Sequence, residues 1–198
     1  VGVADVIPFI PLDGASMEDC VRAANTAGEQ IWKRAGVPVY FYEYAARIPE
    51  RQRLEKTRRK GFDGRPPDIG DVAAHPTAGA SMVGARNILV AYNVNLDTPD
   101  VSIAKEIATE IRESSGGLPH VKAMGLFLDK LQCAQVSMNL TRYQETPIPV
   151  VYAKIEAAAA KRGVKVRNEE LIGFAPRAAG FHDKAKVIED RIALLNSK

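Results

Sequence analysis

Apolar and polar positions alternate in two short stretches of the chain, and this alternation predicts two β-strands that each carry one polar face. The first stretch is Asn93-Val94-Asn95-Leu96, and the second is Gln135-Val136-Ser137-Met138-Asn139-Leu140. Asparagine is a poor strand former, so amides at these positions indicate a role other than solubility. We expect them to hydrogen-bond a small polar ligand.

From residue 86 onward the hydrophobic periodicity predicts the element order β-α-β-β-α-β, the split βαβ arrangement of ferredoxin-like folds. Strands are predicted at residues 88–96, 121–128, 134–140 and 164–172, and helices at 98–114, 146–163 and 183–194. In this topology the first and third strands are central neighbours, and the first two helices cover one face of the sheet. Val94, Val136 and Tyr92 then lie beneath the helices.

The opposite face of that sheet gathers a cluster of polar side chains: Asn93, Asn95, Gln135, Ser137 and Asn139. A buried amide without a hydrogen-bond partner costs about 1–3 kcal/mol, so the cluster requires partners. A bound ligand, ordered water or a structural network with the other half of the protein would each supply them. A ligand-lined cleft and a purely structural network both remain open.

The first half of the chain predicts the remainder of a similar α/β unit. Strands are expected at residues 3–12 and 37–44, and a short basic helix at 49–60. Between the strands, Ser16 and Asp19 form a capping box for a helix that ends at Gly36. The fold class is therefore α+β, with a partial amino-terminal subdomain at 1–79 and a ferredoxin-like carboxy-terminal subdomain at 80–198.

The composition is that of an ordinary globular protein, with 198 residues, 46% hydrophobic residues and 26% charged residues. No apolar run is long enough for a membrane span, and no secretory signal is visible, so a cytoplasmic protein without a membrane partner is expected. Cys20 and Cys133 fit no metal-ligand spacing and are expected to be buried, reduced thiols. The basic segment 47–65 is either a solvated helix face or a positive rim that attracts an anionic ligand.

Established catalytic motifs are absent: the chain has no P-loop, no GxSxG, no HExxH and no metal-binding cluster of cysteine and histidine. Residues 79–84 hold two glycines and favour a tight, small-residue approach to the next strand over an anion-binding loop. His75 lies in the Gly/Pro-rich loop and is either a substrate contact or an exposed loop histidine. RNA binding would need aromatic side chains on the open sheet face, and Tyr92 is predicted on the covered one, so no nucleic-acid partner is expected.

Motifs along almost the whole chain, taken in order, resemble glutamate formiminotransferase, a family that includes the front domain of the bifunctional formiminotransferase-cyclodeaminase. The matching segments are Pro8-Phe9-Ile10-Pro11, Ser16-Met17-Glu18-Asp19-Cys20, Val37-Pro38-Val39-Tyr40, Pro67-Asp68-Ile69-Gly70, Gly84-Ala85-Arg86, Ala91-Tyr92-Asn93-Val94-Asn95-Leu96, Gln135-Val136-Ser137-Met138-Asn139-Leu140 and Glu170-Leu171-Ile172-Gly173.

The resemblance implies transfer of a formimino group from N-formimino-L-glutamate to tetrahydrofolate, in histidine degradation. It implies tetrahydrofolate as co-substrate, no metal, and folate held in a cleft between two subdomains; a homodimer is also expected. The folate-binding loop maps onto Gly70, Asp71, Val72, Ala73, Ala74, His75, Pro76, Thr77, Ala78 and Gly79. Candidate substrate-cleft residues are Arg86, Asn93, Asn95, Lys122, Gln135, Ser137 and Asn139.

The family's catalytic histidine stands in a His-Pro-Arg motif just before the position that corresponds to Gly2. The chain begins within the tail of that motif, so we expect it to be amino-terminally truncated and to lack the general acid–base, and no catalytic residue is assigned. Two alternatives stay open. The chain is a non-catalytic folate-binding or assembly module, or it is a formyltransferase relative that uses N-formyl-glutamate.

Overall fold

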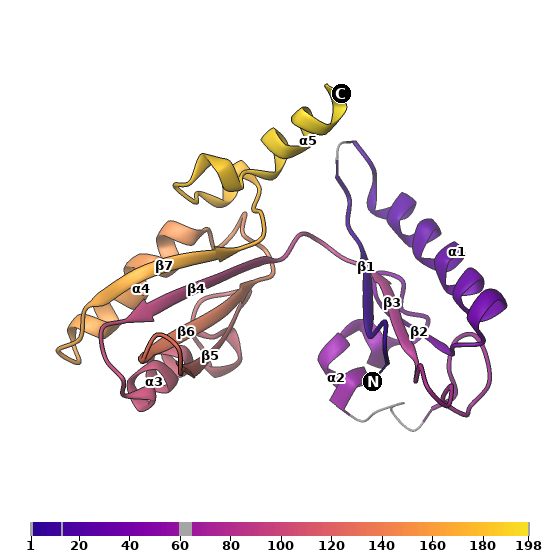
Figure 1. The fold of residues 1–198 in the computed structure, drawn as a ribbon, viewed down its shortest axis with the longest axis horizontal. Coiled ribbons are helices and arrows are strands. Elements are labelled where there is room, and N and C mark those ends of the chain that lie inside the picture. The colour runs from indigo at the N-terminus through magenta and orange to yellow at the C-terminus, as the bar shows by residue number, and fades with distance from the viewer. Residues whose placement is uncertain (1, 13, 60–64, 198) are drawn as a thin grey trace. The chain divides into compact units, whose positions relative to one another are not determined.

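The computed structural model describes residues 2–12, 14–59 and 65–197, which fall into two compact units, Val1–Ile88 and Leu89–Lys198 (Figure 1). Each unit combines helices with one β-sheet. The division lies later in the chain than the expected boundary between residues 79 and 80. The reason is the strand at Ser81–Ala85, which pairs with strands of the first unit.

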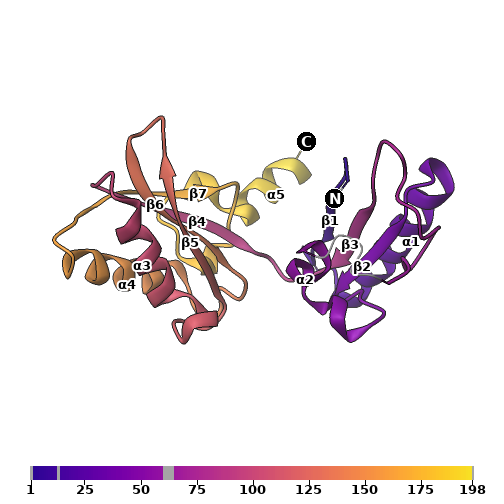
Figure 2. The same cartoon turned by 90° about the horizontal axis from the view of Figure 1, so that it is seen from below.

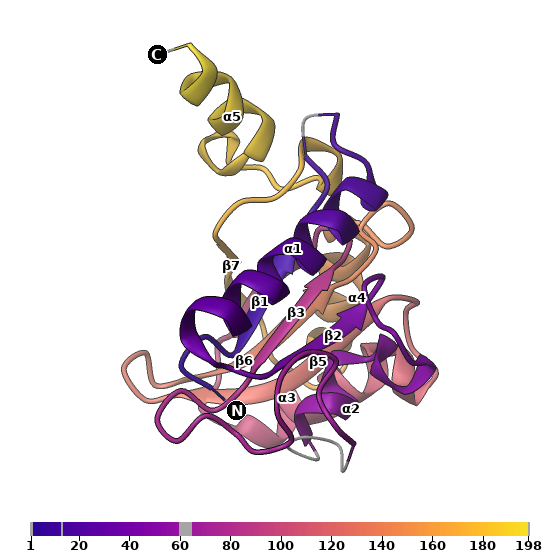
Figure 3. The same cartoon turned by 90° about the vertical axis from the view of Figure 1, so that its right-hand side faces the viewer.

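The first unit is built on a sheet of three parallel strands in the order β1-β3-β2. The 19-residue helix α1 packs on one face of this sheet, as Figure 3 shows, and contributes Ala24 to a core with Phe41 and Val83. The other face packs Tyr42 and Met82 against the short helix α2. The elements are β1 (Val6–Phe9), α1 (Met17–Ala35), β2 (Val39–Glu43), η1 (Pro49–Gln52), α2 (Leu54–Arg59) and β3 (Ser81–Ala85).

Helix α1 begins and ends where the sequence predicts. The Ser16 backbone N–H donates to the Asp19 carboxylate at 2.8 Å, and the Asp19 N–H donates to Ser16 Oγ at 3.1 Å, which completes the capping box. Gly36 follows the helix in the left-handed conformation, with φ of 62°. Local side-chain chemistry therefore sets both ends of this helix.

The strand β3 lies at the centre of the first sheet, although the sequence predicts these residues only as the approach to a strand. Ser81, Gly84 and Ala85 give it little apolar alternation, so its strand character comes from pairing on both edges. Small size is required here, because a Cβ at Gly84 would lie 2.6 Å from the ring of Tyr42. Pairing with both neighbouring strands, and not a local sequence pattern, therefore makes residues 81–85 a β-strand.

The second unit confirms the predicted element order and strand neighbours. Its four strands are antiparallel in the order β5-β6-β4-β7, so the first and third strands of the unit lie side by side at the centre (Figure 1). Figure 2 shows the same sheet from below. The elements are β4 (Val90–Leu96), α3 (Val101–Ile111), η2 (Glu113–Ser115), β5 (Val121–Leu128), β6 (Cys133–Leu140), α4 (Ile148–Ala160), β7 (Val166–Ile172), η3 (Arg177–Ala179), η4 (Lys184–Lys186) and α5 (Ile188–Asn196).

The helix-covered face of the second sheet forms the core of this unit. Tyr92, Val94, Val136 and Leu140 are fully buried there, as the period-2 alternation predicts. Helix α3 lies directly against β5 at Gly125, where a Cβ would be 2.3 Å from the backbone nitrogen of Lys105. Glycine therefore permits direct contact between the helix backbone and the strand.

Cys20 and Cys133 are buried thiols outside any disulfide, which confirms the expectation for both. Across the described ranges, every helix is too short or too polar to cross a membrane.

Replacement of Gly125 by Ala is expected to destabilise the second unit by about 1–3 kcal/mol, because the added methyl overlaps the backbone of α3. Urea unfolding followed by far-ultraviolet circular dichroism measures the effect. Met124→Ala is the matched control, because its exposed side chain lies on the other face of the strand. Equal stability of Gly125→Ala and the parent chain would contradict the proposed close contact.

Candidate functional site

The face of the second sheet opposite α3 and α4 carries polar side chains in three rows that run across the strands. Each row follows from the pairing register in the order β5, β6, β4 and β7. We call this surface the amide face. Its rows are Lys122–Asn139–Ala91–Ile172, Met124–Ser137–Asn93–Glu170 and Leu126–Gln135–Asn95–Asn168.

The third row is a chain of amide hydrogen bonds. Gln135 Nε2 donates to Asn95 Oδ1 at 2.8 Å, and Asn95 Nδ2 donates to Asn168 Oδ1 at 3.2 Å. Asn95 and Gln135 are only 2% and 4% exposed, so both need these partners. In this row the amides satisfy one another, as expected for a structural network.

The first and second rows present more of their polar groups to solvent. Asn139, Lys122 and Glu170 are exposed, and Ser137 is half-buried. Asn93 is buried, and its Nδ2 donates to Glu170 Oε2 at a long 3.5 Å. These two rows have the exposed donors and acceptors that a polar ligand requires.

The sequence predicts five of the side chains on this face, and the structure adds two that it does not predict, Asn168 and Glu170 of β7. A signal for them exists in the sequence, because Asn168 and Glu170 alternate with Glu169 and Leu171 along the strand. The predicted topology also puts the last strand beside the first one. Alternation combined with strand order would have found both residues.

The covered face holds a separate polar cluster around Glu169. The Tyr92 hydroxyl donates to the Glu169 carboxylate, and His182 Nδ1 lies 3.0 Å from Glu169 Oε1. Burial, followed by the hydrogen bond to Glu169, raises the pKa of Tyr92, so the phenol stays protonated. Phe181 packs edge-on against Tyr92, and the cluster thereby holds the segment after β7 against the core.

The loop from Gly70 to Gly79 is closed by a tight turn. His75 and Gly79 exchange two backbone hydrogen bonds of 2.9 Å each. His75 Nδ1 accepts the backbone N–H groups of Ala78 at 3.0 Å and Thr77 at 3.3 Å. Nδ1 acts as an acceptor in this turn, so the tautomer that fits it carries its hydrogen on Nε2.

The other end of the loop rests on the tryptophan of α1. Gly70 has φ of 99°, and a Cβ at this position would lie 2.7 Å from the Trp32 ring. Residues 71–74 that follow are exposed, including Val72 with 74% of its surface accessible. The loop thus combines two fixed ends with an exposed middle.

A buried ion pair anchors the chain just before this loop. Asp68 Oδ2 accepts from Arg51 Nη1 at 2.7 Å and from the Phe41 backbone N–H at 2.8 Å. Arg51 is 2% exposed, donates to the Pro66 carbonyl at 2.8 Å and stacks over the Tyr40 ring. Three kinds of contact therefore fix Asp68 and the start of the loop to β2.

The described arginines of segment 47–65 include several with internal partners. Arg47 donates to the Asp68 carbonyl at 3.1 Å, Arg58 pairs with Asp5 at 2.6 Å, and Arg65 pairs with Glu50 at 2.9 Å. These contacts favour a structural role for this segment over the alternative of a positive rim. Residues 60–64 of the segment lie outside the described ranges.

Arg86 belongs to the first unit and is not part of the amide face. Its backbone N–H donates to the Phe9 carbonyl at 3.0 Å, and its Nη1 donates to the Asn87 carbonyl at 3.0 Å. Burial raises the pKa of the neighbouring Tyr42, and the Arg86 guanidinium opposes that rise. Arg86 therefore stands at the carboxyl edge of the first sheet.

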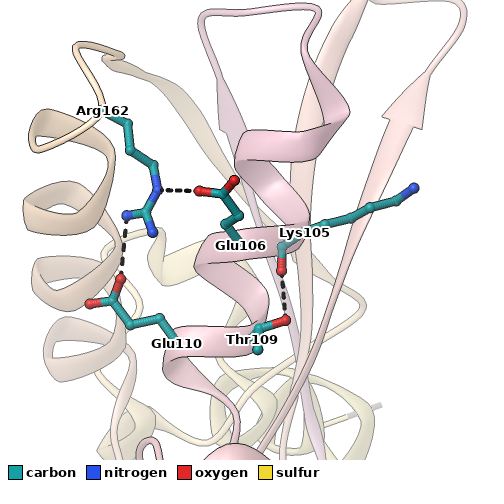
Figure 4. A pocket seen from close by; sticks show the side chains of 5 residues that line it. All are labelled: Lys105, Glu106, Thr109, Glu110 and Arg162. Atoms are coloured by element: carbon teal, nitrogen blue, oxygen red, sulfur yellow. Dashed lines mark hydrogen bonds and ion pairs between the residues drawn. The ribbon is translucent and has the colours of Figure 1, made fainter.

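A groove on the helical surface of the second unit is lined by charged groups that pair with one another (Figure 4). Arg162 Nε lies 3.0 Å from the Glu106 carboxylate, and Arg162 Nη1 lies 3.3 Å from that of Glu110. Arg162 Nη1 also donates to the Ala158 carbonyl near the end of α4. This network fastens α3 to α4, which is a structural role.

Within the described ranges, histidine, cysteine and acidic side chains form no group of three or more suited to hold a metal ion.

Comparison with known protein families finds two matches that follow one another along the chain. Residues 1–86 match the formiminotransferase domain, N-terminal subdomain, and residues 91–191 match the formiminotransferase domain.

Among curated relatives, the glutamate formimidoyltransferase of Streptococcus pyogenes serotype M1 is 41% identical over 187 residues, and that of Thermoplasma acidophilum is 42% identical over 189 residues. Each of these alignments covers 90% of this chain and 62% of the relative. The formimidoyltransferase-cyclodeaminase of Rattus norvegicus is 34% identical over 219 residues, which is 98% of this chain and 40% of the relative. The chain thus spans less than two thirds of the length of these relatives.

Asp68→Asn is expected to destabilise the first unit by about 3 kcal/mol, because it removes the negative charge that faces the buried Arg51 guanidinium at 2.7 Å. Trp32, the sole tryptophan, reports this change by fluorescence during urea unfolding. Glu50→Gln, which removes one partner of an exposed ion pair, is the control and should leave the transition nearly unchanged. Identical unfolding of both variants would show that burial of the Arg51–Asp68 pair has no special effect.

Proposed function

Because the chain belongs to the formiminotransferase domain family, we propose that it acts in transfer of a formimino group from N-formimino-L-glutamate to tetrahydrofolate, a step of histidine degradation. The observation that carries this proposal is the agreement between family matches and folded units. The two matched subdomains, 1–86 and 91–191, correspond to the two compact units of the structure. Both subdomains of the transferase are thus represented by a folded unit.

The loop Gly70–Gly79 is proposed to bind tetrahydrofolate. Two fixed ends support this role, because a preorganised loop loses little conformational entropy when a ligand binds. The His75–Gly79 turn and the Trp32–Gly70 contact supply that rigidity. Exposed Val72 offers an apolar contact, and the exposed backbone around it offers hydrogen bonds.

The amide face is proposed to bind the formimino donor. Exposed Asn139 and half-buried Ser137 both donate and accept hydrogen bonds, and the exposed ammonium of Lys122 donates and carries a positive charge that suits a carboxylate. Asn93 and the third-row amides hold the register that presents them. Within the first unit, Arg86 is proposed separately as a contact for an anionic group.

The reaction needs a group that takes a proton from the folate nitrogen and gives one to the departing glutamate nitrogen, a task suited to histidine. Each histidine of the described residues has a structural partner. His75 uses Nδ1 in its turn, His120 contacts Glu145 at 3.0 Å, and His182 contacts Glu169 at 3.0 Å. We therefore assign binding and positioning, and no proton transfer, to the described residues.

Isothermal titration calorimetry of the chain with tetrahydrofolate and with N-formimino-L-glutamate tests this proposal, and both compounds are expected to bind. Transfer is then followed by mass spectrometry as formation of formiminotetrahydrofolate. Binding of tetrahydrofolate but not of N-formimino-L-glutamate would support the alternative of a non-catalytic folate-binding module. A chain that binds neither compound would contradict the proposed function.

His75→Leu is expected to weaken tetrahydrofolate binding about tenfold, because the Thr77 and Ala78 N–H groups lose their acceptor and the turn loosens. His75→Asn is the matched variant, since its side-chain oxygen replaces Nδ1 as acceptor and should restore most of the affinity. Calorimetry with tetrahydrofolate measures both. If the leucine variant bound as tightly as the parent chain, the turn would have no part in folate binding.

A further inference from the structure

We propose that Glu170 recognises the positive charge of the formimino group and thereby selects a formimino donor over a formyl donor. This inference rests on the proposed function and names the chemical group of the donor that the amide face binds.

Glu170 is the single carboxylate among the strand positions that make up the amide face. The other polar members are amides and a hydroxyl, apart from the cation of Lys122. Lys122 stands on β5 and Glu170 on β7, which are the two edge strands of the sheet. Three strand spacings of about 4.8 Å separate these edges, or about 14 Å between backbones. The face therefore has a positive edge and a negative edge.

The donor has the matching distribution of charge. A formimino group on nitrogen is an amidine, which is protonated near neutral pH and carries planar N–H donors. Its glutamate portion carries two carboxylates, which suit the Lys122 edge. A carboxylate accepts the paired N–H donors of such a planar cation in charge-assisted hydrogen bonds.

A formyl donor lacks this match. Its formyl group is neutral and ends in a carbonyl oxygen, which accepts hydrogen bonds and donates none. A carboxylate is also an acceptor, so a formyl oxygen placed beside Glu170 would meet repulsion. Unfavourable contact with the wrong donor contributes to selectivity as much as attraction of the right one.

The surroundings of Glu170 leave its carboxylate accessible to a ligand on the amide face. Its contact within the amide face is the long 3.5 Å hydrogen bond from Asn93 Nδ2 to Oε2, and the residue is exposed. Its neighbour Glu169 differs in both respects, because it points to the covered face and engages Tyr92 and His182. Of these two adjacent carboxylates, one fastens the core and the other faces the proposed ligand.

The experiment compares N-formimino-L-glutamate with N-formyl-L-glutamate by calorimetry on the full chain. Glu170→Gln keeps the size and hydrogen-bonding capacity of the side chain and removes its charge. It should weaken formimino-glutamate binding about tenfold and leave formyl-glutamate binding unchanged or stronger. Glu156→Gln is the matched control, because it removes an exposed carboxylate from α4 of the same unit and should alter neither affinity. Circular dichroism verifies the fold of both variants.

Two other results would distinguish a failure of this inference from a failure of the proposed function. Binding of both donors by the parent chain with an affinity ratio that Glu170→Gln leaves unchanged would overturn the inference alone. This includes an equal loss for both donors, which would show that Glu170 only orders Asn93. Failure of the parent chain to bind either donor would overturn the proposed donor site and this inference with it.

Discussion

The alternation of side chains along β4 is the constraint on which the second unit depends. This strand is central and pairs on both edges, so a shift of one residue would exchange its two faces. Tyr92 and Val94 would then leave the core, and Asn93 and Asn95 would enter it. The cost of burying unpartnered amides and exposing apolar groups fixes the register, and that register aligns the polar rows of all four strands.

A buried charge pair has a comparable role in the first unit. The side chains of Arg51 and Asp68 are both almost inaccessible. Their burial is tolerated because they pair with each other, Asp68 also accepts from the Phe41 N–H of β2, and Arg51 also donates to the Pro66 carbonyl. The pair fixes the chain two residues before Gly70, where the candidate loop begins. A loop that starts at a fixed point and closes on the His75 turn has few conformations left.

Prediction from sequence succeeds where local chemistry decides the structure and fails where neighbours decide it. The Ser16–Asp19 capping box, Gly36 and the alternation in β4 and β6 are local signals, and the structure confirms each. Strand β3 has no such signal, because the small residue at Gly84 is required by the close approach of Tyr42 from a neighbouring strand. Glu170 was missed for a different reason, since its meaning depends on β7 lying beside β4.

Amide side chains can hydrogen-bond under burial on this face without the desolvation cost that charged groups would have. An amide donates and accepts without ionisation, so Asn95 and Gln135 satisfy each other under burial at no cost of charge desolvation. The same chemistry in Asn93 and Asn139, nearer to solvent, is compatible with a ligand of either sign. Against this neutral background, one cation on β5 and one carboxylate on β7 are sufficient to give a ligand a preferred direction. The buried row thus maintains the strand register, and that register sets the spacing at which the two charged groups act.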